Sequence, residues 1–289
     1  MHLTGSLFRK FRERKGVSVP EAAKEIVSPQ FLRKYERGDN DVSLTNFLNL
    51  LYKENISVVE FFGEYHELTV DVVLDEAERE FDLVINGHRS LLAQKISQKY
   101  HKIYQETQDQ KFLYLALTCE QISYVLFKNR PEVDRSPISE YLRSVEEWGR
   151  FEFFIAQYSM FPLEDEEIYR MTVHIFRKKA QNTVNYYYLH DFFLQVCLEF
   201  IRREELIYAE EILNLYLSKL EDDRELKYMP FDSFARFLGG IILVKRNDPK
   251  GKKLCEAVIT YFEDVLGYTY YANRLNLSYT AFLEKSELS

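Results

Sequence analysis

The polar side chains with the clearest chemical spacing lie in the segment SPQFLRKYERG, residues 28 to 38. On a helix, one face of this segment would carry four long polar side chains: Gln30, Arg33, Lys34 and Arg37. Their spacing of i, i+3, i+4 and i+7 places them one above another over two turns. Such side chains form either a solvated basic surface or a surface that hydrogen-bonds to guanine and adenine edges in the DNA major groove.

Local signals predict five short helices in the first 62 residues, and the basic segment is the third of them. Serines suited to capping a helix N-terminus come before four of these helices: Ser18, Ser28, Ser43 and Ser57. Pro29 at the first helical position strengthens the start of the third helix, and Gly38 is suited to its end. Phe31, Leu32 and Tyr35 share the face of this helix that we expect to anchor it in a core.

The second and third of these helices have almost no linker between them, with the basic face on the later one. This is the arrangement of a helix-turn-helix, in which the second helix enters the major groove and the first crosses the backbone. Arginines on the first helix would add phosphate contacts, which raise affinity without reading sequence. The residues that we expect to contact DNA are Arg9, Arg12, Arg14, Ser28, Gln30, Arg33, Lys34 and Arg37.

Charge is distributed unevenly along the 289 residues, whose net charge is −8. Residues 1–38 hold nine Lys or Arg and four Asp or Glu, whereas the rest of the chain holds 29 basic and 42 acidic residues. A basic end on an acidic chain favours a polyanionic partner at that end only.

From residue 70 onward the sequence predicts one helix after another, with short breaks at Gly, Pro and Asn. The chain is 46% hydrophobic with 10 Gly and 7 Pro, which favours a helix-rich folded protein. We expect helices near 70–86, 88–106, 109–128, 137–148, 150–160, 165–181, 185–202, 205–221, 226–245, 250–266 and 269–285. Antiparallel pairs of such helices have the repeat length of two-helix solenoids, whose grooves suit extended peptides.

The N-terminal motif resembles a known family. Residues 5–62 resemble the five-helix helix-turn-helix domain of the Xre/Cro type, and IVSPQFLRKYERGDNDVS resembles more narrowly the Rgg/GadR/MutR transcriptional regulators. The matching positions are Ser28, Leu32, Lys34, Tyr35, Glu36, Arg37 and Gly38, followed by Asp41, Val42 and Ser43. Lys34 stands where relatives often carry Arg. Lysine lacks arginine's planar bidentate geometry, so we expect a different sequence preference.

The resemblance continues through the second part of the chain. SVEEWGRFEFFIAQYSMF is similar to a helix pair of the same regulators, through Glu146, Trp148, Gly149, Phe151 and Glu152. The resemblance implies an all-α fold, with the helix-turn-helix domain at residues 1–66 and a right-handed tetratricopeptide-like α-solenoid at residues 67–289. It also implies a homodimer whose repeat domain binds a short signalling peptide in its concave groove.

A peptide lying in such a groove needs side chains that hydrogen-bond to its main chain. Where relatives often carry Asn, this chain has Tyr158, so we looked for substitutes on adjacent helices. The expected peptide-binding residues are Arg150, Gln157, Asn182, Asn185, Tyr188 and Gln195.

Other classes of function find little support. The sequence has no Gly-rich phosphate loop, no HExxH and no GxSxG, so we expect no enzymatic activity, no cofactor and no metal site. Cys119, Cys197 and Cys255 lie far apart in apolar patterns, as expected for buried reduced thiols. Neither a leader peptide nor an apolar run of about 20 residues is visible, and we expect a cytoplasmic protein without membrane contact.

The sequence therefore predicts a regulator that binds an inverted-repeat operator in double-stranded DNA as a homodimer and responds to a short signalling peptide. Two alternatives stay open, namely a repeat protein that acts through protein contacts and a repressor controlled by dimerisation alone. No cysteine precedes Cys119, so any pairing of the DNA-binding heads must be noncovalent. Tyr52, Phe61 and Phe62 are the residues we expect at such a contact.

Overall fold

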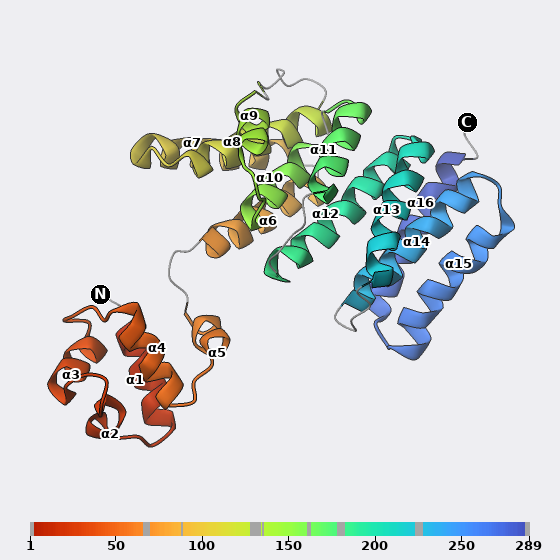
Figure 1. Cartoon of the computed structure of the whole chain (residues 1–289). Coiled ribbons are helices and arrows are strands. Elements are labelled where there is room, and N and C mark those ends of the chain that lie inside the picture. Colours follow the sequence, from red (N-terminus) through yellow and green to blue (C-terminus); the bar gives the residue numbers. More distant parts are fainter. Residues whose placement is uncertain are drawn as a thin grey trace. The chain divides into compact units, whose positions relative to one another are not determined.

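A computed structural model describes residues 3–65, 70–87, 89–127, 134, 136–160, 163–177, 183–222 and 228–286. The chain forms two compact units, residues Met1–Glu76 and Ala77–Ser289 (Figure 1). The described residues contain helices and no strands, which confirms the expected all-α fold class.

Five short helices build the first unit: α1 (Leu3–Arg14), α2 (Val19–Ala23), α3 (Pro29–Arg37), α4 (Leu44–Lys53) and α5 (Val58–Gly63). One apolar cluster holds them together, with Phe8, Leu32, Tyr35, Leu50 and Phe61 almost fully buried. Because each helix is too short to be stable alone, its stability comes from burying one face in this cluster.

The predicted helix starts are confirmed. Ser28 Oγ accepts a hydrogen bond from the Phe31 amide at 3.1 Å, and Ser18 and Ser43 bond in the same way to Glu21 and Asn46. Gly38 ends α3 with a φ of 78°, a left-handed conformation that favours glycine. These caps set the length and the start of the basic helix.

An ion pair in the core of the first unit joins α1 to α3. The Arg12 side chain donates from Nε and Nη2 to the two carboxylate oxygens of Glu36, at 2.6 and 2.9 Å. Its Nη1 donates to the Val17 carbonyl at 2.7 Å, so the same guanidinium also holds the loop before α2. Both side chains are buried, at 7% and 5% exposed.

A close backbone approach makes the same helix contact tight. A Cβ atom at Gly5 would overlap the carbonyl of Tyr35, so only glycine lets α1 and α3 approach this closely. The ion pair and this contact together fix the orientation of α3 within the first unit.

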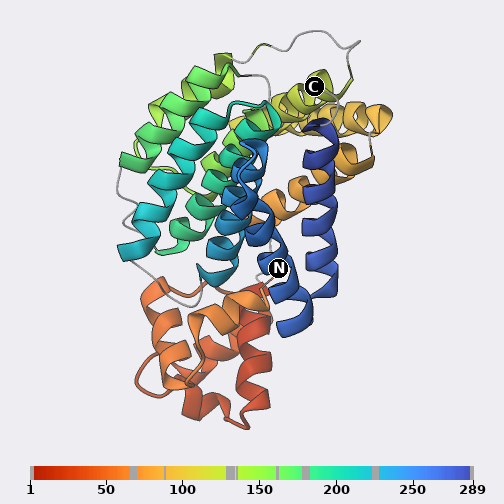
Figure 2. The same cartoon turned by 90° about the vertical axis from the view of Figure 1, so that its right-hand side faces the viewer.

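The second unit is a two-layer stack of helices (Figures 1 and 2). It comprises α6 (Val70–Gly87, which begins before the unit boundary), α7 (Ser90–Thr107), α8 (Gln110–Leu126), α9 (Ser136–Ser144), α10 (Arg150–Ser159), α11 (Asp165–Arg177), α12 (Thr183–Arg202), α13 (Leu206–Asp222), α14 (Met229–Lys245), α15 (Pro249–Thr260) and α16 (Thr269–Ser286). Helices α8, α10, α12, α14 and α16 contact one another in order, and the odd-numbered helices pack against them. This confirms the tetratricopeptide-like solenoid.

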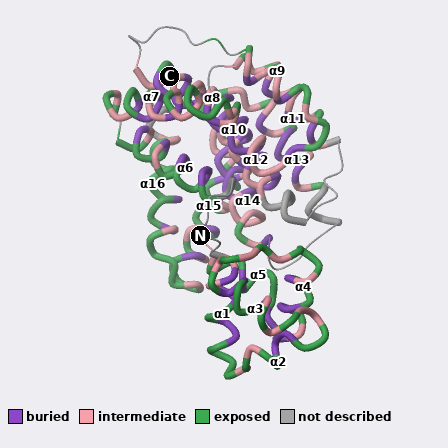
Figure 3. Tube along the Cα trace, turned by 90° about the vertical axis from the view of Figure 1, so that its left-hand side faces the viewer, coloured by how far each residue is buried: buried purple, intermediate pink, exposed green. Residues whose placement is uncertain are grey.

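Each helix of the stack buries one face, as Figure 3 shows by the change between buried and exposed positions along the trace. Phe81, Tyr100, Phe192, Phe193, Phe200 and Phe237 are among the largest fully buried side chains of this unit. These aromatic residues therefore serve helix packing.

The expected helix over 137–148 is too long, because α9 ends at Ser144. The chain turns back there, and the Trp148 indole Nε1 donates to the Leu142 carbonyl at 3.2 Å. The Gly149 amide then donates to Glu152 Oε2 at 2.8 Å, which starts α10. Residues 261–265, expected within a regular helix, instead form a π-helical turn after α15.

We expect the Arg12–Glu36 pair to be required for the stability of the first unit. Changing Arg12→Met leaves the Glu36 carboxylate buried without its partner, which costs about 3 to 5 kcal/mol. The free energy of opening, measured by hydrogen exchange of the α3 amides in the full chain, reports this loss.

The matched control is Arg9→Met, which removes an exposed ion pair with Glu13 on the same helix and should change the free energy of opening little, because exposed pairs are weak. Much of the loss should return in the double variant Arg12→Met, Glu36→Leu, which leaves no charge buried. Equal exchange rates in the two single variants would contradict the assigned role.

Candidate functional site

The basic face of α3 is open to solvent. Gln30, Arg33, Lys34 and Arg37 are all exposed, while Leu32 and Tyr35 on the opposite face are buried. Arg37 Nε donates to Asp39 Oδ2 at 2.8 Å, but both side chains are at least half exposed. Exposed pairs of this kind are weak, so Arg37 can exchange Asp39 for another acceptor.

The three arginines of α1 have different environments. Arg9 and Arg14 are exposed and hold surface ion pairs with Glu13 and Glu64, at 2.6 and 2.8 Å. Arg12 is buried in its pair with Glu36, so the expected phosphate contact from Arg12 is wrong for this geometry. Spacing along α1 cannot distinguish the exposed arginines from the buried one, because the acceptor that buries Arg12, Glu36, lies on α3.

A shallow recess brings basic side chains of α1 and α3 together. It has a volume of about 320 Å³, and the residues that line it are Arg9, Arg12, Glu13, Val19, Arg33, Glu36 and Arg37. Ser28 has a more local role, because its hydroxyl caps α3. The surface available to a polyanion therefore combines the α3 face with Arg9.

An apolar surface lies on α4 and α5. Tyr52 is 86% exposed and Val59 83%, and Leu44 and Phe62 are also exposed. Phe61 is fully buried against Phe11 and Phe47, so the expectation that it lies at a head-to-head contact is wrong. Tyr52 and Phe62 are accessible to a second protein surface.

In the second unit, the structure brings several expected peptide-binding residues to neighbouring positions on α10 and α12. The Arg150 guanidinium lies 5.4 Å from the centre of the Tyr188 ring, a cation–π contact between the two helices. Gln157 follows Arg150 by two helical turns and Gln195 follows Tyr188 by two turns, so each pair shares a helix face. Both glutamines are half-buried.

Two of the expected residues cannot be placed in the same way. Asn182 lies outside the described residues, and Asn185 lies on α12 with its side chain outside them. Tyr158, at the position where relatives often carry Asn, is buried.

Sequence reasoning missed two carboxylates beside this surface. Asp191 hydrogen-bonds to Gln195, and Asp82 on α6 hydrogen-bonds to Tyr158 and faces the charge of Arg274 on α16. Burial raises the pKa of both Asp82 and Asp191, with the neighbouring groups partly opposing that shift. Helices α6, α10, α12 and α16 thus bring five polar side chains together. We call this set the inner polar cluster: Asp82, Tyr158, Asp191, Gln195 and Arg274.

The sequence held a signal for only one of these carboxylates. Asp191 and Gln195 are four residues apart, the spacing of neighbours on a helix, and a search for such pairs would have found them. Asp82 has no comparable local partner, since Tyr158 and Arg274 lie far away in sequence.

Within the described part of the chain, no group of three or more His, Cys, Asp or Glu side chains is arranged to hold a metal ion. Over the same residues, no helix has the length and apolar character needed to cross a membrane. The three cysteines are buried as expected, and burial raises the pKa of Cys119 and Cys255 to about 12.

A family model described as "HTH-type transcriptional regulator Rgg, C-terminal domain" matches residues 94–276. Among solved structures, the SHP pheromone receptor Rgg2 of Streptococcus dysgalactiae is 20% identical with a TM-score of 0.71, covering 98% of this chain and 99% of that one. A putative transcriptional regulator from Listeria monocytogenes EGD-e is 19% identical with a TM-score of 0.78, covering 99% of each chain.

ComR from S. thermophilus, in complex with DNA and its signalling peptide, is 13% identical with a TM-score of 0.51. That match covers 96% of this chain and 99% of the other. At these identities the structures establish a shared fold over nearly the whole chain.

The raised pKa of Asp191 predicts the pH dependence of stability. Because burial raises its folded pKa above the unfolded value of about 3.9, ionised Asp191 destabilises the fold at neutral pH. Asp191→Asn should therefore raise the melting temperature at pH 7, and this gain should disappear as the pH falls below about 4.

Thermal unfolding of both proteins across this pH range is the measurement. Glu263→Gln, an exposed change in the same unit, serves as the control and should leave the melting temperature unchanged. A lower melting temperature for Asp191→Asn at pH 7 would show that the carboxylate is stabilising.

Proposed function

The chain belongs to the Rgg family of HTH-type transcriptional regulators, and on this premise we propose that it binds operator DNA through α3 under the control of a short signalling peptide. The family model and the solved structures confirm the resemblance carried by the sequence motifs. The proposed activity is binding and not catalysis, and its place of action is the cytoplasm.

The observation that carries the DNA-binding half is the geometry of α3. Its buried face is fixed by Leu32, Tyr35 and Glu36, so its opposite face presents Gln30, Arg33, Lys34 and Arg37 in a constant orientation. Side chains pre-positioned in this way can reach base edges with little loss of conformational entropy. Arg9 and Arg14 would exchange their surface carboxylates for DNA phosphates.

We infer that the regulator binds an inverted repeat as a homodimer. One α3 helix reads only a few base pairs, and two-fold symmetry doubles the recognised sequence. The exposed Tyr52, Val59 and Phe62 provide an apolar surface on which two heads can meet without a disulfide.

The peptide-binding half rests on the neighbouring α10 and α12 faces and the inner polar cluster. Arg150 and Gln157 offer hydrogen-bond donors two turns apart on α10, and Gln195 offers another on α12, a set suited to the main chain of an extended peptide. Asp82 and Asp191 add negative charge whose partial desolvation raises the pKa of both groups. A peptide that places a cation here would offset the partial desolvation of these carboxylates, so we propose a peptide with a basic side chain or a free amino terminus at this point.

Support for both halves comes from the matched structures. The S. dysgalactiae relative is a pheromone receptor, and the S. thermophilus relative is a complex with DNA and a signalling peptide. Peptide binding changes DNA binding only if the peptide has a higher affinity for one arrangement of the dimer than for another.

Reversing the charge of α3 should abolish specific DNA binding. We expect Arg33→Glu with Lys34→Glu to weaken binding at least about a hundredfold, because two donors to base edges or phosphates are replaced by repelling carboxylates. The measurement is a gel-shift titration with duplexes selected from a random library by the wild-type protein.

The control is Lys252→Glu with Lys253→Glu, two exposed residues of α15 that change the net charge by the same amount. This variant should bind DNA like the wild type. If the α3 variant keeps its affinity and its helical circular dichroism, α3 is not the recognition helix.

Removing a donor from the α10 and α12 faces should weaken peptide binding. Isothermal titration of the full chain with a pool of short hydrophobic peptides secreted by the source organism should give saturable binding. Gln195→Ala and Arg150→Ala should each lower the affinity several-fold to tenfold, the effect of about one hydrogen bond.

Lys253→Ala is the matched control on an exposed helix face outside this surface. Absence of binding from a folded dimer that still binds DNA would favour the alternative of a regulator controlled by dimerisation alone.

A further inference from the structure

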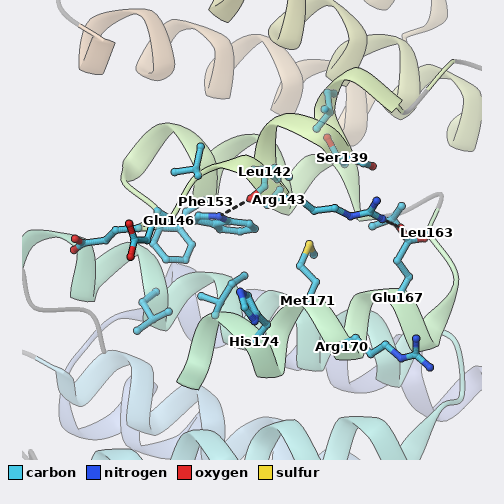
Figure 4. Close-up of a pocket in the computed structure, with 18 of the residues that line it drawn as sticks. Ser139, Leu142, Arg143, Glu146, Phe153, Leu163, Glu167, Arg170, Met171 and His174 are labelled. Atoms are coloured by element: carbon cyan, nitrogen blue, oxygen red, sulfur yellow. Dashed lines mark hydrogen bonds and ion pairs between the residues drawn. The ribbon is translucent and has the colours of Figure 1, made fainter. Parts of the chain in front are cut away.

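A second concave site lies in the solenoid, apart from the surface assigned to the peptide. It is a cavity of about 1020 Å³ lined by residues of α8, α9, α10, α11 and α12 and of the connecting loops. Figure 4 shows Leu142 and Arg143 on α9 facing Met171 and His174 on α11 across this space. Of the expected peptide-binding residues whose side chains the structure describes, Arg150, Gln157, Tyr188 and Gln195, none lines it.

The interior of the cavity is apolar. Trp148, Leu142, Phe153 and Ile175 are buried residues that line it, and Trp148 packs edge-on against Phe153 with ring centres 5.5 Å apart. The indole N–H is already bonded to the Leu142 carbonyl, so the ring contributes apolar surface here. The volume lies at the upper end of the range for small-molecule sites in proteins.

One polar side chain in the lining has no partner. Gln121 on α8 is 2% exposed, and both its Nε2 and its Oε1 are buried without a hydrogen bond. Buried amides are normally hydrogen-bonded, because leaving donor and acceptor unsatisfied costs free energy. An amide that lines a cavity and has both groups unsatisfied is suited to a ligand that donates and accepts at the same point.

The charged side chains of the lining favour a cation. Five glutamates and two arginines line the cavity: Glu146, Glu147, Glu164, Glu166, Glu167, Arg143 and Arg170. Arg143 pairs with Glu167 at 3.3 Å and Arg170 pairs with Glu166 at 2.5 Å, and among the described lining residues acidic side chains outnumber basic ones. A ligand carboxylate would be repelled, which leaves an amide as the group best matched to Gln121.

We propose that this cavity binds a small amphipathic cation that carries an amide. The amide hydrogen-bonds to both Gln121 side-chain groups, the apolar body contacts Trp148 and Met171, and the cationic group lies among the glutamates. This second site would give the regulator an input that does not compete for the α10 and α12 faces.

The probe for this site is L-leucyl-L-phenylalaninamide, which has a free ammonium group, two apolar side chains and a terminal amide. Trp148 is the single tryptophan of the chain, so its fluorescence reports binding here without a label. We expect a saturable change with a dissociation constant below about 1 mM. The methyl ester, which lacks the terminal amide, and the N-acetylated amide, which lacks the cation, should each bind more weakly.

Gln121→Leu is the decisive variant. It should weaken binding of the probe at least about tenfold, through the loss of two hydrogen bonds. It should also raise the melting temperature of the free protein, because an apolar side chain of similar size replaces an unsatisfied buried amide. A glutamine with a purely structural role would show the opposite shift in melting temperature.

Two further variants separate this site from the proposed peptide surface. Gln195→Leu changes an amide of the α12 face and should leave the fluorescence titration unchanged. Met171→Phe adds bulk inside the cavity and should weaken probe binding even if Gln121→Leu does not fold. No response in the wild type, or equal affinity in wild type and Gln121→Leu, would overturn the proposal.

Discussion

The first unit depends on one buried ion pair. Arg12 and Glu36 lie on helices far apart in sequence, and their bidentate contact at 2.6 and 2.9 Å fixes how α3 crosses α1. The nine residues of α3 could not hold a helix alone in water, so its orientation is a property of the packed unit. The same pair uses Arg12 for structure and leaves Arg9, Arg33 and Arg37 to form the outward basic surface.

Buried polar groups have a different role in the second unit. Gln121 has both side-chain groups buried without a partner, and partial desolvation raises the pKa of Asp82 and Asp191, whereas the surrounding helices bury aromatic side chains efficiently. Side chains in such positions lower stability unless a ligand supplies the missing charge or hydrogen bond. A regulator whose free state contains such groups can gain stability when its ligand binds, and this acts as a switch only if the ligand binds one arrangement more tightly than another.

The two proposed ligand sites differ in their chemistry. The α10 and α12 faces offer spaced donors and inner carboxylates, which suit an extended chain. The cavity between α9 and α11 offers an apolar interior, one unsatisfied amide and a negative lining, which suit a compact molecule. The inner polar cluster draws on four helices and the cavity on five, so a change in helix packing would affect both.

The sequence by itself determined the local structure of this protein. Serine caps, Pro29 and Gly38 fixed the helix starts and the end of α3, because a cap is satisfied within four residues. Apolar periodicity placed most solenoid helices within a few residues of their positions, and the family motifs identified the regulator class. Ser144 was missed as a helix end because the cause, the Trp148–Leu142 hydrogen bond, depends on the chain folding back.

Only the tertiary structure decided which polar residues are available for function. Arg9 and Arg12 are indistinguishable by residue type, yet one is exposed and the other is buried against Glu36. Asp82 meets Tyr158 and Arg274 across long stretches of sequence, and Gln121 is a site residue only because α9 and α11 leave a cavity before it. The burial of a side chain and the identity of its partners depend on contacts between distant segments. Periodicity along one helix does not encode those contacts.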